Sequence, residues 1–137
     1  REALEDLLET PGVTLHGFVD DLDALIRHAA ALVVPLRVGG GTRVKILEAW
    51  AKGLPVVSTT IGAEGLYAED GETILLGDTV QAFADKCLVI LQSAEWRRRL
   101  ALNGYVYGSS KFNWSLVGNA LDEVLSRGQD STGSVEG

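Results

Sequence analysis

The sequence predicts an α/β fold in which helices flank a parallel sheet in a doubly wound arrangement. Residues 31–36 form a short continuous apolar run, which is typical of a parallel strand covered on both faces. Stretches with apolar residues at helical spacing alternate with such runs, and turn residues separate the two kinds of segment. Because ligands of doubly wound sheets bind beyond the carboxyl ends of the strands, we expect functional residues in the loops after residues 19, 36 and 60.

Strands are expected where apolar residues alternate with polar ones, or run together, between turn signals. Alternation predicts a strand at 13–19 with one better-buried face. In the strand expected at 54–60, Pro55 is tolerated because it stands near the start. A loop at 61–72, rich in glycine and acids, leads to the last short strand. The expected strands are 13–19, 31–36, 54–60 and 73–76.

Helices are expected where apolar residues recur three and four positions apart. Pro11 and Gly12 end the first of them, and Gly53 ends the third. Asp20 and Asp21 are suited to cap the second. The fourth carries one apolar stripe along its length. The expected helices are 1–10, 22–29, 42–52, 78–91, 94–104 and 114–127.

Length and composition fit a single domain. The 137 residues are 46% hydrophobic and 23% charged, which excludes a disordered chain and a coiled coil. We expect the domain at 1–127 and a disordered tail at 128–137, where glycine, serine and acids dominate. The chain has no methionine and begins at Arg1, so we expect a piece of a longer protein that is truncated on its N-terminal side.

Charge and cysteine content exclude several classes of protein. A net charge of −7 disfavours binding to nucleic acid. The single Cys87 excludes an internal disulfide framework, and with only His16 and His28 beside it no metal site is expected. No apolar run reaches the roughly 18 residues that span a bilayer. We expect a cytoplasmic protein, with attachment to the inner face of the membrane as an alternative.

The segment 37–48, "RVGGGTRVKILE", is the best candidate for a ligand site. Its three glycines, Gly39, Gly40 and Gly41, allow backbone N–H groups to approach a ligand closely, and the start of the following helix favours a phosphate. At about 100° per residue, Thr42, Lys45, Glu48 and Lys52 share one stripe of that helix. Lys45 is then placed to neutralise a phosphate, and Glu48 to accept hydrogen bonds from a sugar hydroxyl.

Other interpretations of this segment remain open at the level of pattern. A Lys and a Glu three positions apart are common on a solvated helix surface, and three glycines also suit a flexible turn. Two sharper motifs are excluded. The Walker A pattern needs a Gly-Lys-Ser/Thr that is missing, and the dinucleotide fingerprint needs a glycine where Val44 stands.

The segments "VTLHGFVDDLDALI", "ALVVPLRVGGGTRVKILEAWAKGLPVVSTTIGAEGL" and "FNWS" resemble a known family. They are similar to the C-terminal half of retaining, GT-B-fold glycosyltransferases of the group 1 (family 4) type, which use nucleotide-sugar donors. The resemblance covers nearly the whole chain apart from the tail. It implies a Rossmann-like sheet, and a parent enzyme of carbohydrate biosynthesis that transfers a sugar from a nucleoside diphosphate sugar to an acceptor. It implies no cofactor besides this donor and no metal.

The resemblance also implies what the chain lacks. The acceptor, whether a glycan, a lipid or a small molecule, would be bound by the N-terminal half, which is missing here. We therefore expect the isolated chain to bind its donor without turning it over, and the sequence assigns no catalytic residue. The Arg and Lys that clamp the diphosphate in this family lie upstream and have no match in this chain.

The family motif is a Glu, seven residues and a second Glu. The second acid usually holds the ribose, and Glu48 matches it. The first acid usually contacts the transferred sugar, but Gly40 stands at that position. This departure leaves contacts with the hexose to backbone groups of residues 39–41, or to a different arrangement altogether.

The resemblance extends to further positions. It places the Gly17-Phe18 turn against the base, and Thr42 or Lys45 near the diphosphate. Glu64 follows the strand at 54–60 and stands where a ligand is expected, although it suits an ordinary loop acid equally. The expected donor-binding residues are Gly17, Phe18, Gly39, Gly40, Gly41, Thr42, Lys45, Glu48 and Glu64.

Two rival functions are weighed against this one. A non-catalytic α/β module that binds a nucleotide or a protein would fit the incomplete acid motif. An NAD-binding domain normally has an acid at the end of the next strand, where Thr59 and Thr60 stand. The basic run at 97–99 suits anionic lipid or an acceptor, or else a solvated helix face, and Cys87 reads as a buried, inert thiol.

One expectation concerns assembly. The resemblance implies two upstream strands that lie between strand 13–19 and strand 31–36. Without them, strand 31–36 would expose an apolar edge, and such an edge is a template for pairing. Strand 31–36 would then either pair directly with strand 13–19 or pair with a second copy of the chain. We expect the second outcome, self-association through this edge.

Overall fold

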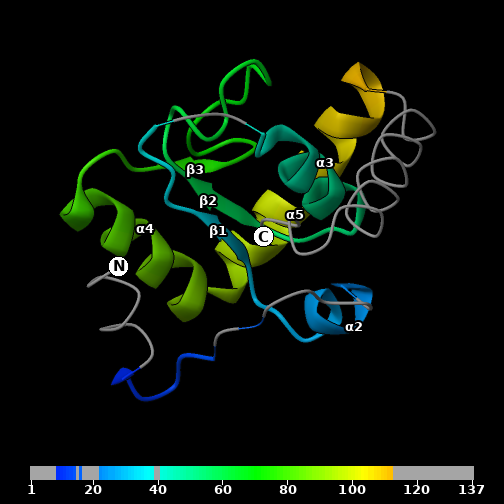
Figure 1. The fold of residues 1–137 in the computed structure, drawn as a ribbon. Helices are drawn as coiled ribbons and strands as arrows, with labels where there is room; N and C mark the ends of the chain where they lie inside the picture. Colours follow the sequence, from blue (N-terminus) through cyan, green and yellow to red (C-terminus); the bar gives the residue numbers. More distant parts are fainter. Residues whose placement is uncertain (1–8, 15, 17–21, 39–40, 113–137) are drawn as a thin grey trace, which may run out of the picture.

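The structure of the protein is a computed structural model that describes residues 9–14, 16, 22–38 and 41–112. The described part is a three-stranded parallel sheet between helices, which confirms the predicted α/β class (Figure 1). In this part of the chain no helix is long and apolar enough to cross a membrane. The elements are α2 (Leu22–Arg27), β1 (Leu32–Val34), α3 (Arg43–Ala51), β2 (Val56–Ser58), β3 (Leu75–Leu76), α4 (Val80–Gln92) and α5 (Ala94–Lys111).

The sheet has the strand order β1-β2-β3, and both pairings are parallel. Val33 of β1 pairs with Val57 of β2, which pairs with Leu75 of β3. Neighbouring residues of a strand point to opposite faces, and both Val56 and Val57 are fully buried. The middle strand is therefore covered on both faces, as its apolar run predicts.

Two hydrophobic clusters cover the two faces of the sheet. On one face Val56 packs with Trp50 of α3. On the other face Val57 packs with Ile90 of α4 and Leu100 of α5. Figure 1 shows α3 and α4 on opposite sides of the sheet, with α5 passing from the layer of α4 to that of α3.

Helix α5 is longer than the sequence predicts. Gly104 was expected to end the helix at 94–104, but α5 continues to Lys111. The reason is a close contact: a Cβ added at Gly104 would lie 2.4 Å from Cδ1 of Trp50, so only glycine lets the two helices approach this far. The expected end is wrong because packing between distant residues overrides the low helix propensity of glycine.

Some expected elements fall outside the described residues. Within the expected strand 13–19, the structure describes Val13, Thr14 and His16, and none of these three lies in a strand. The remaining residues of that segment cannot be compared with the prediction. The other expected segments outside the described part are residues 1–8, 114–127 and 128–137.

Candidate functional site

The loops that follow the three strands meet at the carboxyl edge of the sheet. The Thr59 amide donates to the Val34 carbonyl (3.1 Å). The Gly77 amide donates to the Ser58 carbonyl (3.0 Å). In addition, the Thr59 hydroxyl donates to the carbonyl of Leu36. These bonds tie the loops together at the edge where the sequence predicts ligand binding.

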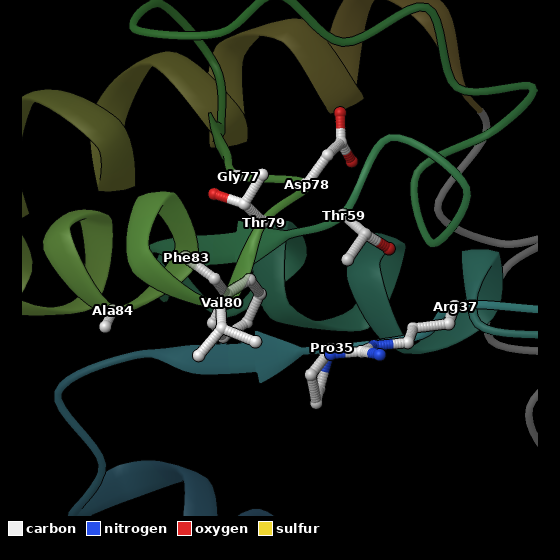
Figure 2. Close-up of a pocket in the computed structure, with 9 residues that line it drawn as sticks. All are labelled: Pro35, Arg37, Thr59, Gly77, Asp78, Thr79, Val80, Phe83 and Ala84. Carbon is white, nitrogen blue, oxygen red and sulfur yellow. The ribbon is translucent and has the colours of Figure 1, made fainter.

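A cavity of about 260 Å³ opens at this edge. In Figure 2, Arg37 enters it from the loop after β1, Thr59 from the loop after β2, and Val80 and Phe83 from the start of α4. The exposed Arg37 guanidinium suits an anionic group, and Phe83 offers an apolar wall. The lining residues are Pro35, Arg37, Thr59, Gly77, Asp78, Thr79, Val80, Phe83 and Ala84.

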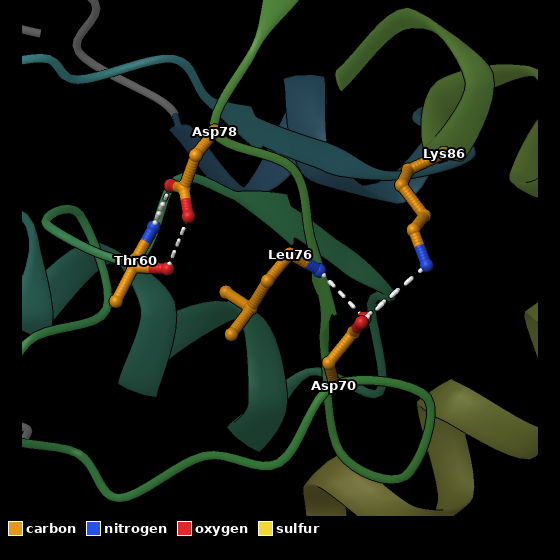
Figure 3. A network of polar contacts seen from close by, with 5 residues as sticks. All are labelled: Thr60, Asp70, Leu76, Asp78 and Lys86. Atoms are coloured by element: carbon orange, nitrogen blue, oxygen red, sulfur yellow. Dashed lines mark hydrogen bonds and ion pairs between the residues drawn. The ribbon is translucent and has the colours of Figure 1, made fainter. Parts of the chain in front are cut away.

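Asp78 at the rim of this cavity fixes the loop after β2. Its Oδ1 accepts from the Thr60 amide at 2.8 Å, and its Oδ2 accepts from the Thr60 hydroxyl at 2.7 Å (Figure 3). These bonds, the backbone one first, hold the pKa of Asp78 below the usual value for an aspartate. The sequence did not point to Asp78, although its place two residues after the last strand was the signal that could have identified it.

The start of α3 lies at the same edge, and its N-cap residue makes no side-chain cap hydrogen bond. Gly41 has φ +85°, a conformation that a residue with a side chain rarely adopts. Thr42, at the N-cap, forms no side-chain cap; its hydroxyl instead donates to the Gly62 carbonyl at 2.6 Å. No acid stands in the first turn, and Arg43 is the first helical residue. Together the helix dipole and the guanidinium give this end of α3 a positive potential.

Lys45 and Glu48 lie further along α3, and both are partly buried. The side chain of Glu48 is 14% exposed, and its Oε1 lies 3.5 Å from Nζ of Lys52. Glu48 and Lys52 therefore share one face of the helix, as the predicted stripe requires. Before its carboxylate can accept a hydroxyl donor, Glu48 has to share or leave this ion pair.

Glu64 lies in the loop after β2, and the structure brings this loop against the start of α3. Besides the bond from Thr42, a Cβ added at Gly65 would lie 2.8 Å from Nη1 of Arg43, so the guanidinium rests on this glycine. The side chain of Glu64 is exposed. Of the expected donor-binding residues, the structure thus brings Thr42 and the loop of Glu64 together. Gly17, Phe18, Gly39 and Gly40 lie outside the described residues.

Arg97 and Arg99 of the basic run at 97–99 make contacts within the protein that the sequence did not indicate, and Cys87 is less buried than predicted. Arg97 donates to the carbonyls of Ile90 (2.7 Å) and Leu91 (3.1 Å) at the end of α4, so it is not simply part of a solvated face. Arg99 pairs with Glu72 at 3.1 Å. Cys87 is only partly buried, and desolvation raises the pKa of its thiol. Among the residues that the structure describes, no three His, Cys, Asp or Glu side chains gather into a metal site.

Two relatives place this geometry among known proteins. A Klebsiella pneumoniae protein described as an "uncharacterized 44.6 kDa protein in cps region" is 25% identical over 102 residues, which are 74% of this chain and 26% of that protein. The crystal structure of the C-terminal domain of a glycosyl transferase group 1 family protein (LpcC) from Francisella tularensis superposes with a TM-score of 0.67. At 23% identity, that match covers 80% of this chain and 58% of the other and shows the fold.

Family membership follows from a match over most of the chain. Residues 1–93 match the family described as glycosyl transferases group 1. The chain spans about a quarter of the length of the curated relative. The match and the fold agree with the resemblance predicted from the sequence. The chain therefore belongs to the glycosyl transferases group 1 family and has the fold of the C-terminal GT-B domain.

Proposed function

We propose that the chain is the donor-binding part of a glycosyltransferase that transfers a sugar from a nucleoside diphosphate sugar to an acceptor. The observation that carries the proposal is the start of α3. It lies at the carboxyl edge of the sheet, follows a glycine of positive φ, and has no acid and no side-chain cap in its first turn. Such a helix start favours a diphosphate.

The residues around this helix start supply the further contacts that a nucleotide sugar needs. Arg43, the first residue of α3, and Arg37, in the loop between β1 and α3, add positive charge. In a glycosyl transfer, the negative charge grows on the departing diphosphate, so donors fixed in advance at that position would lower the barrier. Glu48 would accept hydrogen bonds from the ribose, and Lys45 would stand near the phosphates. Most of the groups that bind the acceptor would belong to the rest of the parent enzyme.

The length of the chain relative to its curated relative fits a donor-binding part of a larger enzyme. The chain matches only 26% of its curated relative, so the activity of the parent protein is itself part of the proposal. We also propose the cytoplasm, or the inner face of the membrane, as the place of action. A single cysteine, which cannot form an internal disulfide, suits a reducing compartment.

Calorimetric titration of the chain with UDP, GDP, ADP, CDP and dTDP tests the proposal directly. We expect one of these nucleotides to bind more tightly than the others, and its sugar conjugate to bind as well. Turnover by the full-length parent with that conjugate then separates an enzyme from a non-catalytic nucleotide-binding module. If none of the nucleoside diphosphates binds, the proposed donor role is wrong.

A further inference from the structure

A second cavity, of about 300 Å³, lies under the loop between β2 and β3. Most of its wall is apolar. Among the lining residues, Glu64 contributes a carboxylate and Tyr67 an aromatic ring. A cavity of this size is at the lower end of ligand-binding pockets and fits one small ring better than a whole nucleotide. The lining residues are Thr60, Ile61, Ala63, Glu64, Gly65, Tyr67, Ala68 and Leu76.

The loop that forms this cavity is fixed at its start and in its middle. Asp78 holds Thr60 through the two bonds described above. In Figure 3 the Leu76 side chain points toward Thr60, and both residues line the cavity. In the middle, the Gly62 amide donates to the Thr59 hydroxyl at 3.1 Å. A Cβ added at Gly62 would lie 2.5 Å from Oγ of Ser58, so this part of the loop rests directly on β2.

The end of the loop is fixed by α5. The Tyr107 hydroxyl lies 2.6 Å from the carbonyl oxygen of Leu66 and 3.0 Å from that of Tyr67, and it shares its hydrogen bond between them. The Tyr107 ring packs edge-on against Trp50, with ring centroids 5.5 Å apart. A partly buried residue of α5, which packs against the core, thus fixes the backbone position of Tyr67.

Tyr67 has an unfavourable backbone conformation, and its side chain makes few contacts because it is largely exposed. Its φ is +54°, and it is the one residue other than glycine with positive φ among those described. Its side chain is 86% exposed. Strain of this kind persists only where surrounding contacts impose it, and it is concentrated at functional sites. The contacts that impose it here present an aromatic ring to solvent at the mouth of a cavity.

Glu64 supplies the polar group of the same cavity. Its exposed carboxylate has no hydrogen bond or ion pair with the residues that the structure describes, so both oxygens are available as acceptors. An aromatic ring with an apolar face, next to a carboxylate, suits a neutral ligand with C–H groups on one side and hydroxyls on its rim. A phosphate would be repelled by this carboxylate. The chemistry therefore favours a sugar ring over a nucleotide.

We propose that this cavity is a saccharide subsite, in which the ring of Tyr67 packs on one face of a sugar and Glu64 accepts hydrogen bonds from its hydroxyls. Arg43 rests on Gly65, so the cavity lies next to the start of α3. The saccharide would be part of the acceptor, an assignment that rests on the proposed transferase function. Its binding, however, is independent of the donor and can be measured without it.

The test is an NMR titration of the 137-residue chain with methyl glycosides of glucose, galactose, mannose and N-acetylglucosamine at millimolar concentrations. We expect at least one glycoside to shift the amide resonances of residues 60–68. Replacing Tyr67 with Leu keeps a Cβ at the same backbone angle but removes the ring, and should weaken binding by about tenfold. Tyr67→Phe keeps the ring and should retain the affinity.

One control and two further variants separate the subsite from other causes of binding. Tyr105→Leu removes another exposed tyrosine, on α5, and should leave glycoside binding unchanged. Glu64→Gln keeps an acceptor without the charge and should weaken binding less than Tyr67→Leu does. Tyr107→Phe keeps the edge-on packing but releases the loop end, and should weaken glycoside binding as well.

Two results would overturn the subsite: no shift with any of the four glycosides, or equal affinity of the wild type and Tyr67→Leu. Titration of the same samples with UDP, GDP and ADP keeps this inference apart from the proposed function. If the nucleotides bind and the glycosides do not, the subsite is wrong and the donor role stands. If only the glycosides bind, the donor role is wrong and the subsite stands.

Discussion

Glu48 illustrates how one side chain can serve the fold and a ligand in turn. Its carboxylate is mostly buried and pairs with Lys52 across one turn of α3. A pair of this kind at positions i and i+4 contributes only about 0.3 to 0.5 kcal/mol to helix stability. A hydrogen bond from a ligand hydroxyl can therefore compete with it for the carboxylate.

Our first prediction is that Glu48→Gln weakens binding of the nucleotide sugar by about 1 to 3 kcal/mol, the scale of a lost hydrogen bond to a charged group. Calorimetric titration of the variant measures the change. Lys52→Met is the matched control, because it breaks the same ion pair from the other side and leaves the carboxylate in place. Unchanged affinity in Glu48→Gln would contradict the ribose assignment.

The second prediction concerns Gly41. A Val at this position would place a side chain where the diphosphate is expected to approach the backbone, so Gly41→Val should abolish donor binding. Gly53→Val is the control at the other end of α3, because Gly53 also has a positive φ and open space around it. Both variants should lose similar stability in thermal unfolding, but only Gly41→Val should lose the nucleotide. Loss of binding in both would mean that strain, not obstruction, is the cause.

At the scale of whole elements, the contact between α3 and α5 decides how the helical layer is built. Gly104 of α5 meets the Trp50 ring of α3, and the Trp50 Nε1 donates to the Thr73 carbonyl at 3.2 Å. Asn103 adds a bond from its side chain to the Glu72 carbonyl at 2.9 Å. These contacts hold α5 to α3 and to the loop before β3.

Gly104→Ala is therefore predicted to destabilise the protein, although the same change in an open helix usually stabilises it. The added methyl group has to displace the Trp50 ring, which should lower the free energy of unfolding by about 1 to 3 kcal/mol. Urea unfolding followed by circular dichroism measures it. Val106→Ala, at an exposed position of the same helix, should be close to neutral. A Gly104→Ala variant as stable as the wild type would show that the two helices can separate without loss.

The sequence predicted the elements whose signal is local, and not those set by distant contacts. The apolar runs at 31–36 and 54–60 and the periodic stretch at 42–52 correspond to β1, β2 and α3, each longer in prediction than in the structure. The predicted end of the helix at Gly104 is wrong because the residue that Gly104 contacts, Trp50, lies far away in the sequence. The strained backbone of Tyr67 and its anchor Tyr107 could not be predicted for the same reason.

The residues of the candidate site also fall into two groups, those indicated by the local sequence and those brought together by the fold. The glycine segment and Glu48 could be identified from pattern and resemblance, because both lie within a few residues of each other. Arg37 and Asp78 come from two separate loops, and only the parallel sheet brings their ends to one edge.

At the scale of the whole molecule, the described sheet has an open side at β1. The Leu32 amide donates to the Pro55 carbonyl (2.9 Å) and the Val34 carbonyl accepts from Thr59, so the backbone groups of Val33 face away from β2. The Val33 side chain is 48% exposed. An apolar groove of about 190 Å³, which includes Val33 and Leu91, runs beside it.

We predict that the 137-residue chain self-associates through this side of β1. Light scattering over a range of concentrations should show a rise in mean mass. Val33→Lys places a charge at the edge and should lower the association, as charged edge residues do in natural sheets. Val38→Lys changes an exposed valine outside the sheet and should not. A monomer at every concentration, or association unaffected by Val33→Lys, would show that this edge does not pair.

The burial of Trp50 has a spectroscopic consequence. Its indole is fully shielded from water and bonded to the Thr73 carbonyl, and the Tyr107 ring stands nearly perpendicular at 5.5 Å. An indole in such surroundings emits at shorter wavelengths than one in water, and a phenol this close passes its excitation energy to it. Because the neighbours of Trp50 come from α3, α5 and the loop before β3, its emission reports on the union of three segments that are far apart along the chain.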